Sequence, residues 1–135
     1  MNCRAFAVVA AACIWTGAAS AQTSPHRVKV QSGVLEGAVS GAVASFKAIP
    51  YAAPPVGEFR WRAPQPPVAW AGIRAASDYG PACIQTAGAS GYRGAQSEDC
   101  LTLNVWVPAA GTAKKPVMVW LHGGGFAYGD RKSVV

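Results

Sequence analysis

The residues best suited to chemistry are three consecutive glycines, residues 123–125, which directly follow the apolar stretch "PVMVWLH". Glycine lacks a Cβ atom, so another group can approach its backbone closely. Bare N–H groups after a strand suit a developing negative charge, which is what an oxyanion hole requires. A phosphate loop needs Gly-x4-Gly-Lys-Ser/Thr, and "GGGFAYGDRKS" lacks that spacing. A purely structural turn stays open on the triplet alone, but the strand before it and Phe126 after it favour the oxyanion function.

The elements that must position these glycines are strands. Residues 116–122 are almost continuously apolar, which is typical of a strand buried on both faces. Residues 101–108, "LTLNVWVP", alternate apolar and polar side chains and predict a second strand. Residues 28–55 contain short apolar stretches separated by glycines, the pattern of hairpins. We expect no helix after residue 21, so the strands predict the front part of a larger α/β sheet without its covering helices.

Prolines and polar residues define two loops. Residues 50–67 hold six of the ten prolines and predict a fixed, extended loop, because proline cannot donate to a strand ladder. We expect Trp61 and Trp70 to hold this loop by burying their rings. Residues 84–97 are rich in Gly, Ala and Ser without periodicity and predict a second loop.

Composition excludes some classes of function. The 135 residues suffice for one domain at most, and 51% hydrophobic with 13% charged residues is not the composition of a disordered chain. The net charge of +6 comes from scattered residues, whose longest runs are two residues long. A nucleic-acid partner is therefore not expected, because it requires a clustered basic face.

The first 21 residues predict a signal peptide. Arg4 is followed by the short apolar core "AFAVVAAACIW", and Ala19-Ser20-Ala21 fits the small-x-small cleavage pattern. We expect cleavage after Ala21 and export, either secreted or periplasmic. The apolar core is too short to span a bilayer. A membrane anchor and a lipoprotein signal at Cys13 are the alternatives, and the alanines before Cys13 lack the bulky aliphatic residue of such signals.

Cleavage would leave two of the four cysteines, Cys83 and Cys100. An even pair in an exported chain indicates one disulfide. It would close a loop of 16 intervening residues, which the loop-entropy model values at about 3 kcal/mol. Two free buried thiols are the alternative.

With these motifs in place, the chain resembles the type B carboxylesterases, a family of the α/β-hydrolase fold that includes cholinesterase-like proteins. "FKAIPYAAPPVGEFRWRAPQPPVAW" and "SEDCLTLNVWVP" are similar to two family signatures, and "HGGGF" to its oxyanion loop. The resemblance covers nearly all of residues 22–135. It implies the α/β-hydrolase fold class, with only the N-terminal strands and the oxyanion loop present, as an incomplete domain.

The resemblance also implies roles for single residues. Gly124 and Gly125 would donate backbone N–H groups to the oxyanion, with a third donor from the residue after the nucleophile. Gly123 would allow the turn, and His122 would orient the loop by hydrogen bonding. The family places its catalytic base far downstream, so His122 as the base is the weaker interpretation. We expect no cofactor and no metal site.

Two further pairs follow from the resemblance. Cys83 and Cys100 match the first disulfide of the family. Arg60 matches an arginine that pairs with an acidic residue of the second signature, here Glu98. The alternative for Arg60 is a solvated charge beside Trp61.

The chain departs from the family in its nucleophile, since no serine lies in Gly-x-Ser-x-Gly. Ser90, in "GASGY", has Tyr92 at the second glycine position. We interpret the terminal "DRKSVV" as an interruption, from a truncated gene, a frameshift or an incomplete sequence. Cholinesterases place a tryptophan in the disulfide loop to bind a quaternary ammonium, whereas the aromatic residue here is Tyr92.

We therefore expect a secreted serine carboxylesterase that transfers the acyl group of a small-molecule ester to water. The 135 residues alone should be inactive. A catalytically dead cholinesterase-like binding module and a non-functional truncated product are the alternatives.

Overall fold

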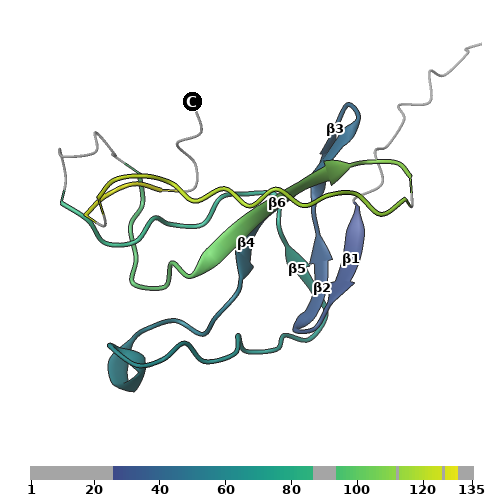
Figure 1. Ribbon diagram of the computed structural model, residues 1–135. Coiled ribbons are helices and arrows are strands. Elements are labelled where there is room, and N and C mark those ends of the chain that lie inside the picture. The colour runs from purple at the N-terminus through teal and green to yellow at the C-terminus, as the bar shows by residue number, and fades with distance from the viewer. Residues whose placement is uncertain (1–25, 87–93, 112, 126, 131–135) are drawn as a thin grey trace, which may run out of the picture.

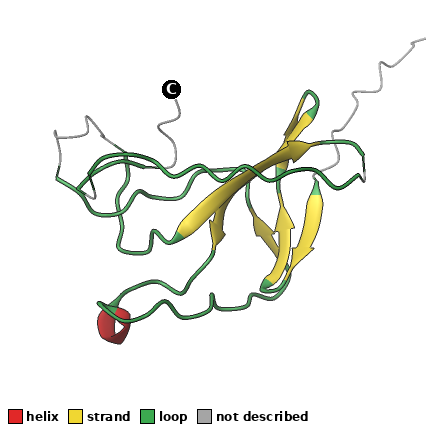
Figure 2. Cartoon of the chain, viewed as in Figure 1, coloured by secondary structure: helices red, strands yellow, loops and turns green. Residues whose placement is uncertain are grey.

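The computed structural model describes residues 26–86, 94–111, 113–125 and 127–130 (Figures 1 and 2). Its regular elements are short strands and a single turn of 3-10 helix. In chain order they are β1 (Arg27–Val30), β2 (Gly33–Glu36), β3 (Ala38–Ser40), β4 (Val43–Pro50), the 3-10 helix η1 (Gly57–Phe59), β5 (Ile73–Ala75) and β6 (Thr102–Pro108).

The strands form two three-stranded sheets. The first has the order β1-β2-β5, with β1 antiparallel to β2 and β5 parallel to it. The second has the order β3-β4-β6 and is antiparallel throughout. The chain passes from the first sheet to the second at Gly37, between β2 and β3, where an added Cβ would lie 2.7 Å from the ring of Phe46. The absence of a side chain at Gly37 therefore lets the two sheets approach each other.

A β-bulge interrupts the longest strand pair. Phe46 pairs with Val105 and Ile49 with Leu103, so two residues of β4 face one residue of β6. Ala48 lies in the bulge at φ 53°, and its N–H donates to Asn104 Oδ1 at 3.0 Å. The amide of Asn104 thus supplies the acceptor that the interrupted ladder does not.

The core lies where the two sheets meet. Leu35 of β2, Ala44 and Phe46 of β4, and Ala76 after β5 are buried together. Ala76 joins the sheets through its backbone, because its N–H donates to Glu36 O and its carbonyl accepts from Lys47 N, both at 2.8 Å. Leu35 is the largest fully buried side chain of the described residues. The core is therefore small.

The proline-rich loop crosses the surface as expected, but only one of its two tryptophans holds it in the expected way. Trp70 packs against the core, and its indole N–H donates to Val34 O at 3.0 Å. The expectation for Trp61 is wrong: this residue follows η1 at φ 58° and is 100% exposed. No described residue covers its ring. A backbone hydrogen bond from Ala53 N to Gln65 O, at 2.9 Å, ties the loop together instead.

The strand predicted for residues 101–108 is confirmed as β6, whereas the strand predicted for residues 116–122 is wrong. Figure 1 shows the latter as an extended coil, and Met118 within it is 93% exposed. A strand needs a neighbour to receive its backbone hydrogen bonds. No segment within the described ranges pairs with residues 116–122. The expectation of no helix after residue 21 also needs a small correction, because η1 forms one 3-10 turn.

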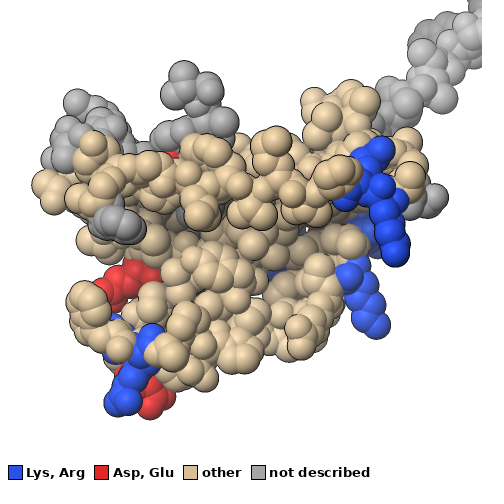
Figure 3. Space-filling model, viewed as in Figure 1, with Lys and Arg blue, Asp and Glu red and all other residues tan. Residues whose placement is uncertain are grey.

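The surface carries dispersed charge. Figure 3 shows Lys and Arg side chains at separate places on the visible face, without one continuous basic patch. No helix in the described part of the chain has the length and apolar character of a membrane span.

Replacement of the principal core side chain tests this fold. We expect Leu35→Ala to lower the free energy of unfolding by about 2–5 kcal/mol, because it leaves a cavity between the sheets. Val28→Ala is the matched control, since Val28 faces Leu35 in the strand register and is exposed. It should cost less than about 1 kcal/mol. Urea denaturation followed by circular dichroism measures both, and equal losses would contradict this packing.

Candidate active site

The three glycines at residues 123–125 begin a tight loop, here called the glycine loop (residues 122–129, of which Phe126 lies outside the described residues). Gly124 has φ 121°, Gly125 has φ 58° and Gly129 has φ 120°. Residues with a Cβ atom rarely adopt such φ values, so Gly124, Gly125 and Gly129 each require glycine. The sequence reaches this backbone path by placing glycine where the chain reverses.

Hydrogen bonds close the loop upon itself. The carbonyl of Gly124 accepts from the N–H groups of Ala127 at 3.0 Å and Tyr128 at 3.3 Å. An added Cβ at Gly124 would overlap the carbonyl oxygen of Tyr128. Among the described residues, no hydrogen bond uses the N–H of Gly124 or Gly125. The carbonyl of Gly124 is thus engaged in the turn, whereas its N–H donates to no acceptor among the described residues.

His122 contacts the backbone of the same loop. Its Nδ1 lies 2.8 Å from Gly123 O, and a carbonyl can only accept, so this contact requires the proton on Nδ1. The ring also abuts Gly129, where an added Cβ would lie 2.5 Å from Nδ1. The imidazole therefore lies between the start and the end of the loop. Its orienting role, as opposed to a role as base, stays a prediction.

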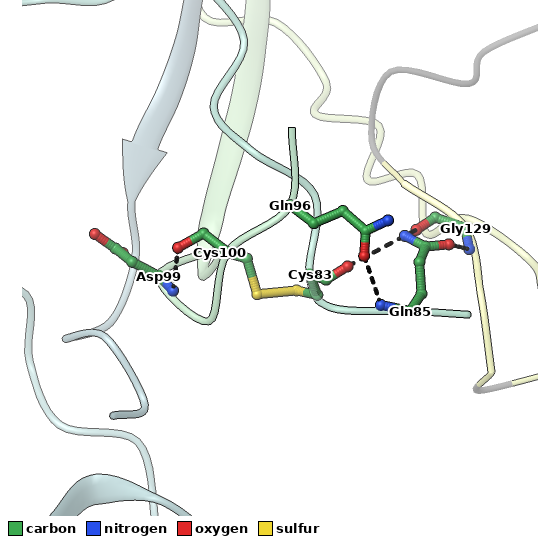
Figure 4. The surroundings of a disulfide bond; sticks show 7 residues. Cys83, Gln85, Gln96, Asp99, Cys100 and Gly129 are labelled. Carbon is green, nitrogen blue, oxygen red and sulfur yellow. Dashed lines mark hydrogen bonds between the residues drawn. A yellow bond between two sulfur atoms is a disulfide. The ribbon is translucent and has the colours of Figure 1, made fainter. Parts of the chain in front are cut away.

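Gln85 joins the glycine loop to the disulfide loop (residues 83–86 and 94–100 of the described chain). Its Nε2 donates to Gly129 O at 3.0 Å, and Gly129 N donates to Gln85 Oε1 at 2.9 Å. Figure 4 shows the carboxamide facing the peptide of Gly129. The composition of residues 84–97 predicts only a loop and does not single out Gln85. The only signal available there was an amide two residues after Cys83.

The disulfide between Cys83 and Cys100 is confirmed, with the two Cα atoms 5.0 Å apart (Figure 4). It connects Gln85's segment to the start of β6, because Cys100 precedes Thr102 by two residues. Backbone pairing reinforces it, since Ala82 bridges Gln96 and accepts from Ser97 N at 2.9 Å. The structure thus fixes both ends of the disulfide loop.

Arg60 and Glu98 also lie together, with Nη2 2.8 Å from Oε1. This contact joins the proline-rich loop to the disulfide loop. The two side chains are 56% and 42% exposed, so the pair contributes on the order of 0–1 kcal/mol. A shallow hollow of about 240 Å³ next to it is lined by Pro55, Trp61, Ile84 and the disulfide. It lies away from the glycines and carries no nucleophile.

Other predicted residues cannot be placed. The signal segment 1–21, Ser90, Tyr92 and Phe126 lie outside the described residues. Within the described ranges, no group of three or more His, Cys, Asp or Glu side chains could hold a metal ion. The described part of the site therefore consists of backbone N–H groups and the side chains that hold them.

Comparison with known proteins gives the family. The family model described as "Carboxylesterase family" matches residues 24–134. The chain belongs to the carboxylesterase family. The resemblance to type B carboxylesterases is thereby confirmed.

Similar curated proteins are esterases from several organisms. Fumonisin B1 esterase of Sphingopyxis macrogoltabida is 50% identical over 116 residues, covering 82% of this chain and 21% of that protein. Para-nitrobenzyl esterase of Bacillus subtilis is 42% identical over 106 residues, covering 76% and 22%. Acetylcholinesterase of Bungarus fasciatus is 38% identical over 117 residues, covering 76% and 19%. The chain thus spans about a fifth of the length of the curated relatives it matches.

Solved structures agree with this assignment. A PNB esterase structure matches with a TM-score of 0.73 and 41% identity, covering 78% of this chain and 23% of the other. The carboxylesterase EST55 of Geobacillus stearothermophilus matches with a TM-score of 0.69 and 45% identity, covering 76% and 20%. The fold class predicted from sequence, an α/β-hydrolase fold of which the chain covers only a part, is confirmed.

Alanine substitutions in the glycine loop should separate its positions. An alanine at Gly124 would place its Cβ against the carbonyl of Tyr128, and it would also have to adopt a positive φ. We therefore expect Gly124→Ala to displace the amide signals of residues 122–129 in NMR spectra. At Gly123 a Cβ meets no described atom within 4 Å, and φ is not positive. Gly123→Ala should therefore leave the remote loop signals in place. Equal disturbance by both substitutions would contradict the described backbone.

Proposed function

We propose that the protein containing these residues hydrolyses carboxylic esters of small molecules by serine-type acyl transfer, through an acyl-enzyme that water then cleaves. The observation that carries the proposal is the glycine loop, closed on itself and held by Gln85, in a chain of the carboxylesterase family. Acyl transfer needs a nucleophile, a base and oxyanion donors. It needs no cofactor.

The N–H groups of Gly124 and Gly125 are the proposed donors in this chain. They would bind the oxyanion of the tetrahedral intermediate together with a third N–H, from the residue after the nucleophile. Glycine serves here because it permits the positive φ values at these two positions and leaves space for the substrate oxygen. Fixed donors stabilise charge that appears only during reaction, which is why such groups contribute strongly to the rate.

Residues 1–135 indicate which reaction is catalysed, but they do not identify one substrate. The similar proteins include a fumonisin B1 esterase, a phenmedipham hydrolase and acetylcholinesterases. Their names give three different substrates, yet all of them share this segment with the chain. The resemblance over this segment therefore supports ester hydrolysis as the reaction class without naming one substrate, and we take the glycine loop as the common catalytic element.

We also propose that the chain is exported, with cleavage after Ala21. The Cys83–Cys100 disulfide supports export, because disulfides persist in oxidising compartments. The positively charged start and short apolar core of residues 1–21 support it from the sequence.

Residues 1–135 on their own should be inactive, because they contain no Gly-x-Ser-x-Gly nucleophile. We expect the purified chain to hydrolyse p-nitrophenyl butyrate no faster than its Gly124→Pro control. The longer product of the same gene should hydrolyse it and should label with a fluorophosphonate. A labelled serine in the 135-residue chain, free of longer species by mass, would contradict the inactivity. A longer product whose nucleophile position is not serine would favour the binding-module alternative, and the absence of any longer product would favour the truncated-gene alternative.

Choline esters should not be preferred by the longer product. The disulfide loop has Tyr92 and no tryptophan among residues 84–99, so the cation–π contact used by cholinesterases is reduced. We expect kcat/KM for butyrylcholine to equal or fall below that for 3,3-dimethylbutyl butyrate, its uncharged isostere. A several-fold preference for the charged ester would refute this expectation.

A further inference from the structure

Gln85 and the backbone of Gly129 form a two-bond pair that connects two loops 44 residues apart in the chain. We propose that Gln85 is a positioning residue for the oxyanion donors, a role that rests on the proposed ester hydrolysis. It does not touch the glycines that would bind the oxyanion. It acts by fixing the end of the loop in which they lie (Figure 4).

The chemistry of the pair requires a carboxamide. Gly129 presents one donor, its N–H, and one acceptor, its carbonyl, and a glutamine side chain offers the matching acceptor and donor at once. A carboxylate of the same length would still accept from the N–H. It would, however, bring its second oxygen against the carbonyl of Gly129, where the amide now donates at 3.0 Å. An apolar side chain would leave both groups of Gly129 without this partner.

Gln85 is itself held on the opposite side. Its backbone N–H donates to Gln96 Oε1 at 2.8 Å, and its Nε2 also reaches Cys83 O at 3.3 Å. Cys83 is bonded to Cys100, which is buried at the entrance to β6. The carboxamide of Gln85 is therefore held near β6 by the disulfide and by hydrogen bonds. Its two bonds to Gly129 can in turn hold the end of the glycine loop in place.

Gly129 contacts the residues that directly precede the proposed oxyanion donors, so its position affects theirs. Its α-carbon packs against the ring of His122 and against Gly123 O, where an added Cβ would lie at 2.5 and 2.6 Å. The preceding residue, Tyr128, donates its N–H to Gly124 O. A shift of Gly129 would therefore press on the start of the loop and tilt the peptide of Gly124. Oxyanion donors act only when they are aimed at the developing charge, so even a small tilt should slow the reaction.

Gln85→Glu tests the proposal, with Gln65→Glu as the matched control. Gln65 is exposed, and its side chain donates to Ala63 O within the proline-rich loop. In NMR spectra of the 135-residue chain near pH 7, we expect Gln85→Glu to move the amide signals of Gly124, Gly125 and Gly129. Signals of β4 and β6 should stay in place. Gln65→Glu should leave the glycine signals unchanged.

A pH titration of the Gln85→Glu variant separates the loss of the hydrogen bond to Gly129 O from a general disturbance of the fold. A protonated carboxyl group has one donor and one acceptor, as a carboxamide has. The glycine signals of Gln85→Glu should therefore return toward their original positions as the pH falls through about 4, the usual pKa range of a glutamate. Gln85→Met, which keeps the length of the side chain but has neither group, should show the displacement without the return. If Gln85→Glu fails to fold, the displacement of the glycine signals can still be measured in Gln85→Met.

The second arm measures catalysis by the longer gene product. We expect Gln85→Met to lower kcat for p-nitrophenyl butyrate about tenfold while KM changes less than about twofold, because a misdirected donor weakens transition-state binding more than substrate binding. The affinity for a trifluoromethyl ketone, which forms the oxyanion adduct, should fall in parallel. Gln65→Glu should change neither quantity.

The outcomes are distinguishable. Unmoved glycine signals in both Gln85 variants would overturn the proposal, and so would moved signals with unchanged kcat and ketone affinity. If the unsubstituted longer product neither hydrolyses esters nor labels with a fluorophosphonate, the proposed function fails instead. The NMR arm then still decides whether Gln85 fixes the glycine loop.

Discussion

The Cys83–Cys100 disulfide is the constraint on which the arrangement of the loops depends. It attaches a long irregular segment to the start of β6, one of the few regular elements in the described chain. The disulfide loop in turn contacts two other segments, through Arg60–Glu98 on one side and Gln85–Gly129 on the other. The proline-rich loop and the glycine loop are therefore both tied to one covalently closed segment.

A covalent tie matters here because the packed core is small. Leu35 and Phe46 are its only large buried side chains among the described residues, and alanines fill much of the rest. Burial of so little apolar surface offsets only part of the conformational entropy that folding costs. At the same time, residues 117–121 expose a run of large apolar side chains. The composition of this run is that of a strand buried on both faces.

The accuracy of the sequence predictions depended on how local their causes were. β6 and the disulfide could be predicted, because alternation and cysteine pairing are carried by the residues themselves. The prediction for residues 116–122 failed because strand formation depends on a hydrogen-bonding neighbour, which no pattern within the segment supplies. The prediction for Trp61 failed because burial of a ring depends on which other segments pack against it, and the residue type alone does not specify them. Asn104 and Gln85 were missed because an amide acquires its role only from a partner 56 or 44 residues away.

The glycine motif shows how far a local pattern can carry a functional argument. The sequence presents Gly123, Gly124 and Gly125 as equals, but the structure gives them different requirements. Gly124 needs both a positive φ and the space occupied by the Tyr128 carbonyl, whereas Gly125 needs only the positive φ. Gly129, outside the triplet, needs a positive φ and contact with His122. The shape of the glycine loop is therefore defined by Gly124 and Gly129 together. The second of these is held by a side chain that the motif does not contain.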